Sequence, residues 1–203
     1  MALAKRTQQE RRTETTRALV AAARACFADK GYAGTGTPEI VAAAGVTRGA
    51  LYHHFADKQA LFHAVVEQEA ATVAAEIERA APGARTAVEA LLAGGDAYLE
   101  AMREAGRTRL LLLDGPAVLG REKMDAIDDR HGNRTLREGL MAAMQGREIR
   151  RIPLDPLTAL VAAAFDRAAL AIEGGADRDA FRVAMHALIN GLLDAPRHAG
   201  QDD

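Results

Sequence analysis

A short segment near residue 50 carries the side chains with the clearest chemistry in this chain. Arg48, Tyr52 and His53 are spaced so that they lie on the exposed surface of a predicted helix. A guanidinium can bind guanine through two hydrogen bonds, a phenol can contact a phosphate or a thymine methyl group, and an imidazole adds a polar contact. Gly49 would let this helix approach a groove closely. These residue types predict contacts to bases in double-stranded DNA.

Two predicted helices must position these side chains. Thr37 and Pro38 suit a helix start, because a threonine hydroxyl can cap free N–H groups and proline at the first helical position loses no hydrogen bond. Gly45 suits a sharp turn with positive φ. Thr47 can then cap the second helix, in which Leu51 faces the core. This pattern is typical of a helix-turn-helix.

Three further residues are predicted to bind phosphates. Thr37, Thr47 and Lys58 lie at helix starts, where backbone N–H groups converge. The alternative for Thr47 is a cap alone, and for Tyr52 a partly buried packing residue. Through Lys58 the chain has nine Lys or Arg against five Asp or Glu, whereas the remainder has seventeen against twenty-three. This asymmetry favours phosphate contacts in the N-terminal part.

The segment from Ala44 to Phe62 reads AGVTRGALYHHFADKQALF, and it resembles the DNA-binding signature of the TetR family of bacterial transcription regulators. Gly31 and the residue after it fit the end of a first helix, so the resemblance covers residues 13–66. Gly36 departs from the pattern, because such proteins more often carry a hydroxyl or branched residue there. The role of Gly36 and of the backbone just before Thr37 is therefore left open.

The resemblance implies an all-α protein, in which an N-terminal three-helix helix-turn-helix domain is joined to a larger C-terminal helical domain for ligand binding and dimerisation. The composition agrees, since the 49% hydrophobic content includes only 4% aromatic residues and consists largely of Ala and Leu. We expect a flexible basic arm over 1–12, the DNA-binding domain over 13–58 and the regulatory domain over 59–203. A linking helix over about 57–81, capped by Asp57, would belong to both domains.

A cavity for a small organic effector is implied by the same resemblance. Apolar residues of the central helices could line it, and His131, four residues after Ile127, could orient a polar group of the ligand. Each has a plainer reading as core, or, for His131, as a structural or surface histidine. The candidate lining residues are Met102, Leu110, Leu113, Met124, Ile127, His131 and Met144.

The last two predicted helices carry apolar, mostly small residues in stripes. Small residues let helix axes approach closely. In TetR-like proteins two such helices from each subunit form a four-helix interface, which implies a homodimer. The alternative is that the stripes close the core of the monomer. The predicted interface consists of Leu157, Leu160, Val161, Ala164, Ala168, Phe181, Met185, Leu188 and Leu192.

Catalysis is not expected. The histidines show no metal-binding spacing, and the chain has no nucleophile elbow, phosphate loop or dinucleotide fingerprint. Cys26 is the only cysteine, which excludes a disulfide within the chain and a zinc site made of several thiolates. We expect no cofactor and no metal. The absence of a signal peptide or a membrane-length apolar run predicts a cytoplasmic protein without a membrane partner.

These features predict a ligand-responsive repressor that binds an inverted-repeat operator as a homodimer and is released by a small organic effector. One alternative is a transcription activator of the same fold. Another is a helical ligand-binding dimer without DNA binding, which would require a degraded reading surface.

Overall fold

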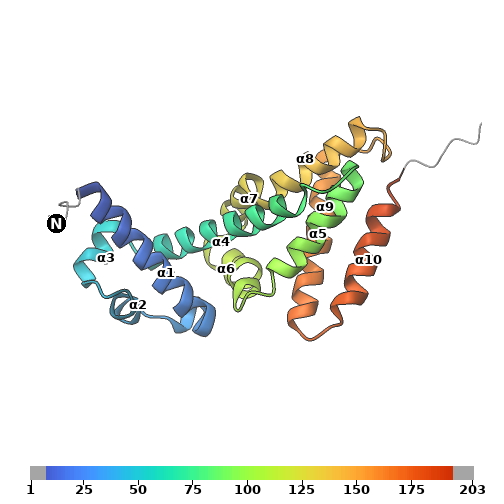
Figure 1. Cartoon of the computed structure of the whole chain (residues 1–203). Helices are drawn as coiled ribbons and strands as arrows, with labels where there is room; N and C mark the ends of the chain where they lie inside the picture. Colours follow the sequence, from blue (N-terminus) through green and yellow to red (C-terminus); the bar gives the residue numbers. More distant parts are fainter. Residues whose placement is uncertain (1–7, 194–203) are drawn as a thin grey trace, which may run out of the picture. The chain divides into compact units, whose positions relative to one another are not determined.

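The computed structural model describes residues 8–193, which form ten α-helices and one π-helix with no strand among them (Figure 1). This confirms the all-α fold class. No helix in this described range is long and apolar enough to cross a membrane. The elements are α1 (Gln8–Gly34), α2 (Thr37–Ala44), α3 (Arg48–His54), α4 (Lys58–Ala80), α5 (Ala87–Ala101), η1 (Arg109–Asp114), α6 (Gly115–Leu119), α7 (Arg121–Arg130), α8 (Gly132–Gln145), α9 (Leu154–Glu173) and α10 (Arg178–Asn190).

The chain divides into two compact units. Unit 1 consists of Met1–Ala71 and Glu104–Ile127, and unit 2 of Thr72–Arg103 and Asp128–Asp203. The backbone passes between them three times. One of these crossings lies inside α4 and another inside α7. We expected a single boundary near residue 58. The structure instead groups a later segment with the N-terminal helices.

The first helix of unit 1 is longer than expected. It begins at Gln8, so residues 8–12 are helical, although we assigned them to an arm; residues 1–7 of that arm lie outside the described residues. Its regular geometry is interrupted at Gly31, where φ is +72°, a conformation that favours glycine. The Asp57 carboxylate accepts a hydrogen bond from the Ala60 N–H at 2.7 Å, as the predicted cap requires. This cap accounts for the start of α4 at Lys58.

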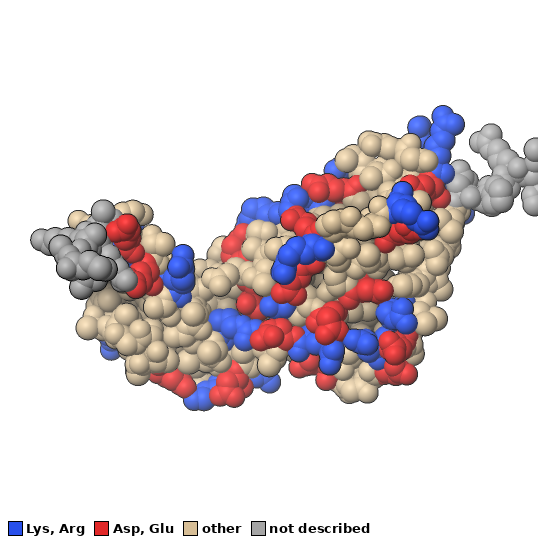
Figure 2. Space-filling view, in the orientation of Figure 1, with Lys and Arg blue, Asp and Glu red and all other residues tan. Residues whose placement is uncertain are grey.

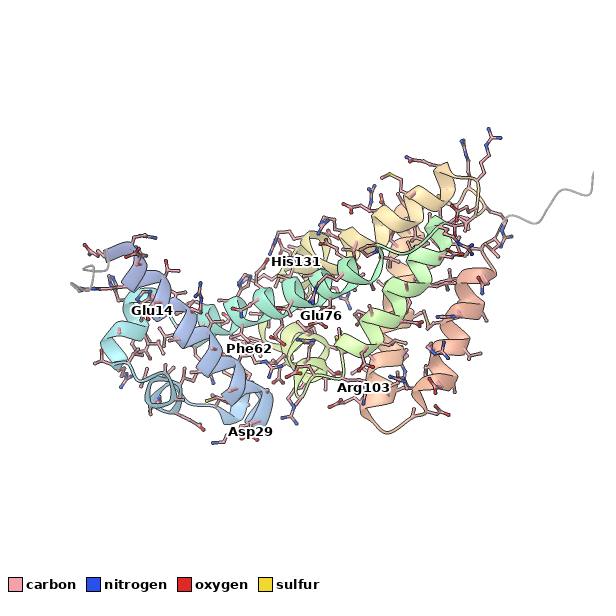
Figure 3. All side chains as sticks on the ribbon, in the orientation of Figure 1. Glu14, Asp29, Phe62, Glu76, Arg103 and His131 are labelled. Atoms are coloured by element: carbon pink, nitrogen blue, oxygen red, sulfur yellow. The ribbon has the colours of Figure 1, made fainter. Side chains whose placement is uncertain are left out.

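An aromatic cluster joins α1 to α4 in unit 1. The ring centroid of Phe62 lies 5.1 Å from that of Phe27 and 4.9 Å from that of Tyr32. Figure 3 shows Phe62 pointing from α4 toward α1. Phe27 and Phe62 are fully buried, so these two rings belong to the core of the unit.

Buried charges explain why residues 104–127 belong to unit 1. Arg107 Nε donates to Glu69 Oε2 at 3.0 Å, and both side chains are less than 10% exposed. Arg24 Nη2 lies 3.2 Å from the same Glu69 oxygen. The Asp114 carboxylate accepts a hydrogen bond from the Tyr32 N–H at 2.8 Å. A buried charge that lost its partner would be costly, so these contacts hold the segment against α1 and α4.

Unit 2 is a helical bundle built around α5, α8, α9 and α10. A Cβ added at Gly95 of α5 would lie 2.5 Å from a ring atom of Phe165, so the absence of a side chain lets the two helices pack closely. The Glu148 carboxylate caps α5 by accepting hydrogen bonds from the N–H groups of Ala87 and Val88. Tyr98 donates to Asp166 Oδ1 at 2.6 Å. The face drawn in Figure 2 shows acidic and basic side chains interspersed over this bundle.

Candidate nucleic-acid interface

The turn between α2 and α3 has the geometry that its sequence predicts. Gly45 adopts the left-handed conformation with φ 66°, and the N–H groups of Gly45 and Val46 bond to carbonyl groups of α2. The Thr47 hydroxyl accepts a hydrogen bond from the Ala50 N–H at 3.1 Å and so caps α3. Leu51 is fully buried. Residues 37–54 thus form a helix-turn-helix.

The start of α2 differs from the expectation. We assigned the cap to Thr37, but the N-cap position is held by Gly36, which provides no side-chain hydrogen bond; Thr37 begins the helix. Gly36 has φ −101°, an extended conformation that any residue adopts. A Cβ added there would make only an ordinary contact, 3.4 Å from Pro38. Neither conformation nor space therefore requires glycine at this position.

The predicted base-reading residues lie on the exposed surface of α3. Arg48, Gly49, Tyr52 and His53 are all exposed. The guanidinium carbon of Arg48 lies 5.5 Å from the ring centroid of Tyr52, one helical turn further on. A Cβ added at Gly49 would meet only the Thr47 hydroxyl, at 3.9 Å, so this part of the helix surface is open. The four residues form one accessible surface beside the turn.

The Tyr52 phenol has a lowered pKa. A hydrogen bond with the Thr37 side chain, followed by one with Arg48, lowers the pKa of the Tyr52 phenol. A pKa is lowered when neighbours donate to the oxygen or carry positive charge, since both stabilise the phenolate. The surroundings of this phenol therefore favour its ionised form.

Lys58 is engaged at the end of α1. Its ammonium donates to the Tyr32 carbonyl at 2.9 Å and to the Thr35 carbonyl at 3.0 Å, and it lies 4.0 Å from the centroid of the Tyr32 ring. Two of its three hydrogens therefore satisfy carbonyl groups where the chain leaves α1. The structure gives Lys58 a structural contact, and its role in phosphate binding stays a prediction.

His54 has a role that the sequence left unassigned. Its Nδ1 lies 3.0 Å from the Thr16 hydroxyl, which also lies 3.0 Å from the Arg12 carbonyl. A hydroxyl has one hydrogen, so when it donates to the carbonyl it accepts from His54 Nδ1–H. Burial, then the charges of His53 and Arg12, lower the pKa of His54. The neutral ring thus joins α3 to α1; its position three residues after the buried Leu51 was the available signal.

The residues predicted to line an effector cavity are divided between the units. Leu110, Leu113, Met124 and Ile127 belong to unit 1, and the structure buries all of them except Leu113, which is 52% exposed. Met102, His131 and Met144 belong to unit 2. A hollow of about 160 Å³ in unit 2 includes Met102 in its lining. Its lining consists of Leu99, Met102, Arg103, Ala169, Ile172 and Glu173.

The predicted dimer residues lie on different sides of α9 and α10, which run side by side in Figure 1. Leu160 and Leu188 are 71% and 59% exposed, and Val183, which the prediction omitted, is 61% exposed. The other predicted residues are buried in the core of unit 2 or packed against it: Leu157, Val161, Ala164, Ala168, Phe181, Met185 and Leu192. α9 begins at Leu154, and Asp155 lies in its first turn.

An exposed helix that follows a glycine turn and is capped by a threonine defines a helix-turn-helix protein. The family model for bacterial regulatory proteins of the TetR family matches residues 19–65. The model for the tetracycline-repressor-like C-terminal domain matches residues 88–196. The chain belongs to the TetR family.

Known relatives agree with this assignment. A TetR-family transcriptional regulator from Pectobacterium atrosepticum has a solved structure that is 32% identical, with a TM-score of 0.74; the match covers 95% of this chain and 100% of that one. The A-factor receptor protein of Streptomyces griseus is 35% identical over half of this chain and 35% of its own length. The transcriptional repressor AcnR of Corynebacterium glutamicum is 40% identical over 30% of this chain and 33% of its own length. The chain thus spans about a third of the curated relatives it matches.

Proposed function

We propose that this protein is a ligand-responsive repressor that binds an inverted-repeat DNA operator as a homodimer and is released by a small organic effector. The observation that carries the proposal is the exposed surface of α3, where Arg48 and Tyr52 lie one turn apart on a well-formed helix-turn-helix. Such a helix fits the major groove, where a guanidinium can distinguish guanine from the other bases.

Dimerisation is supported by the exposed apolar residues of the last two helices. Leu160 lies on α9, and Val183 and Leu188 lie on α10. Large apolar side chains that are exposed to water favour burial against a partner. A two-fold dimer would present two copies of α3 to half-sites about one helical turn of DNA apart.

The connections between the units support a coupling between effector and DNA. Because α4 and α7 each begin in one unit and end in the other, a change in the packing of unit 2 displaces helices that also belong to unit 1. We expect the effector to bind better to a state of the dimer in which the two helix-turn-helix domains are wrongly spaced for the operator. Such an effector would lower the affinity for the operator. By linkage, the operator would lower the affinity for the effector by the same factor.

DNA binding is tested with the purified protein and duplexes taken from upstream of its own and neighbouring genes. A shuffled duplex of equal length serves as the control. We expect a preference for one natural duplex and an affinity that falls steeply between about 50 and 200 mM salt. Equal, weak binding to all duplexes would refute the proposal. A reporter gene behind the bound duplex then separates repression from activation.

The dimer is tested by measuring the molar mass of the Leu188→Glu variant in solution. We expect it to shift toward the monomer, because the substitution places a charge at an apolar interface. Met141→Glu is the matched control, since Met141 is an exposed apolar residue of α8, outside the proposed interface. A wild-type monomer, or the same mass for both variants, would argue against this interface.

A further inference from the structure

Two side chains of α3 are in contact on the exposed surface that is predicted to read DNA. Arg48 and Tyr52 lie one turn apart on this helix. The guanidinium carbon of Arg48 lies over the Tyr52 ring, 5.5 Å from its centroid. Arg48 is exposed, and the Tyr52 ring lies beside its charged group.

From this arrangement we propose that Tyr52 is a positioning residue for Arg48. The proposal rests on the proposed DNA binding, because its purpose is to orient a guanidinium toward a base edge. It changes the expected role of Tyr52 from a contact of its own to a contact that acts through Arg48.

The physical reason is the conformational freedom of arginine. A free arginine side chain on a helix surface adopts many rotamers, and it loses this freedom when it binds a base through two hydrogen bonds. A guanidinium that already lies over an aromatic ring loses less. The strength of an exposed cation–π contact corresponds to a change in affinity of about two- to fivefold.

The first test needs no DNA. Burial raises the pKa of Tyr32 and of Tyr98, so among the three tyrosines Tyr52 ionises first as the pH rises. Arg48→Gln removes the positive charge beside the ring, which favours the phenolate, so we expect the first phenolate absorbance step to move to higher pH. Arg48→Lys keeps a positive charge and should leave the step nearer its wild-type pH. An unchanged step in Arg48→Gln would overturn the contact between Arg48 and the Tyr52 ring.

The second test is a double-mutant cycle on the duplex that the wild-type protein selects from a random pool. We expect Tyr52→Leu to reduce the preference for this duplex over random DNA by about two- to fivefold. In the Arg48→Ala background the same substitution should have little effect, because the residue that it positions is absent. If the losses of preference in the two single variants add in full in the double variant, the proposal is overturned.

Two controls separate the possible failures. Tyr52→Phe keeps the ring beside Arg48 and loses the hydroxyl, so it should retain more of the preference than Tyr52→Leu; equal losses would contradict a role for the ring. Thermal unfolding of each variant reports whether unit 1 remains folded, and Tyr52 is 43% exposed, so little change is expected. If the wild-type protein selects no duplex, the proposed function fails, while the phenol titration still tests the contact between Tyr52 and Arg48.

Discussion

The buried ion pair between Glu69 and Arg107 makes a strong prediction about stability. Their side chains are 8% and 7% exposed, and Glu69 Oε2 accepts hydrogen bonds from the guanidinium groups of both Arg107 and Arg24. Replacing Glu69 with Gln removes the negative charge that faces the buried Arg107 guanidinium. Removing one partner of a buried pair destabilises a protein by about 3–5 kcal/mol. We expect Glu69→Gln to lower the free energy of unfolding by an amount in this range.

The measurement is urea unfolding at fixed protein concentration, because dissociation of a dimer would also contribute. Arg24→Gln is the matched control: its side chain is 24% exposed, so its loss should cost about 1 kcal/mol or less. The double variant Glu69→Leu with Arg107→Met replaces the pair with apolar groups and should be more stable than Glu69→Gln. A loss below 1 kcal/mol in Glu69→Gln, or a double variant less stable than the single one, would refute the reasoning.

The remaining predictions concern both units. Gly36→Ser supplies the missing cap of α2 and reduces the freedom of the unfolded chain, so unfolding should require about 0.5–1 kcal/mol more; a destabilised variant in a urea titration would contradict this. Burial raises the pKa of Asp166, so the neutral form is favoured in the folded state, and the associated stability is lost as the pH rises through that raised value. Tyr98→Phe removes the hydrogen bond that partly offsets this rise, so the cost, about 1–3 kcal/mol at neutral pH, should shrink in acid; a loss that does not vary with pH would count against it. Lys58→Ala should weaken binding to every duplex and lower stability, whereas Arg48→Ala should lose sequence preference alone; identical binding profiles for the two would exclude these roles.

Local signals were sufficient for the reading motif. Gly45 determines the turn, Thr47 the start of α3 and Asp57 the start of α4, because each acts on backbone groups within three residues or so. The cap of α2 was assigned one residue too late, because Thr37 has the right chemistry but already belongs to the helix.

Long-range contacts were not predictable from the same signals. Lys58 bonds to carbonyl groups 23 and 26 residues away, and Arg107 pairs with a carboxylate 38 residues away. Nothing in the local spacing identifies such partners. Leucine periodicity also gave the apolar stripes of the last helices without showing which side faces the core: Met185 is 4% exposed, and Leu188, three residues later, is 59% exposed.

The noncontiguous composition of unit 1 has a consequence for how the protein is made. As the chain leaves the ribosome, α1 to α4 emerge before Arg107 and Asp114 have been synthesised. Until then Glu69 lacks one of its guanidinium partners, and the Tyr32 N–H lacks its carboxylate. The DNA-reading helices are translated first, yet their unit reaches its final packing only after the backbone has left it, formed α5 and returned through residue 127.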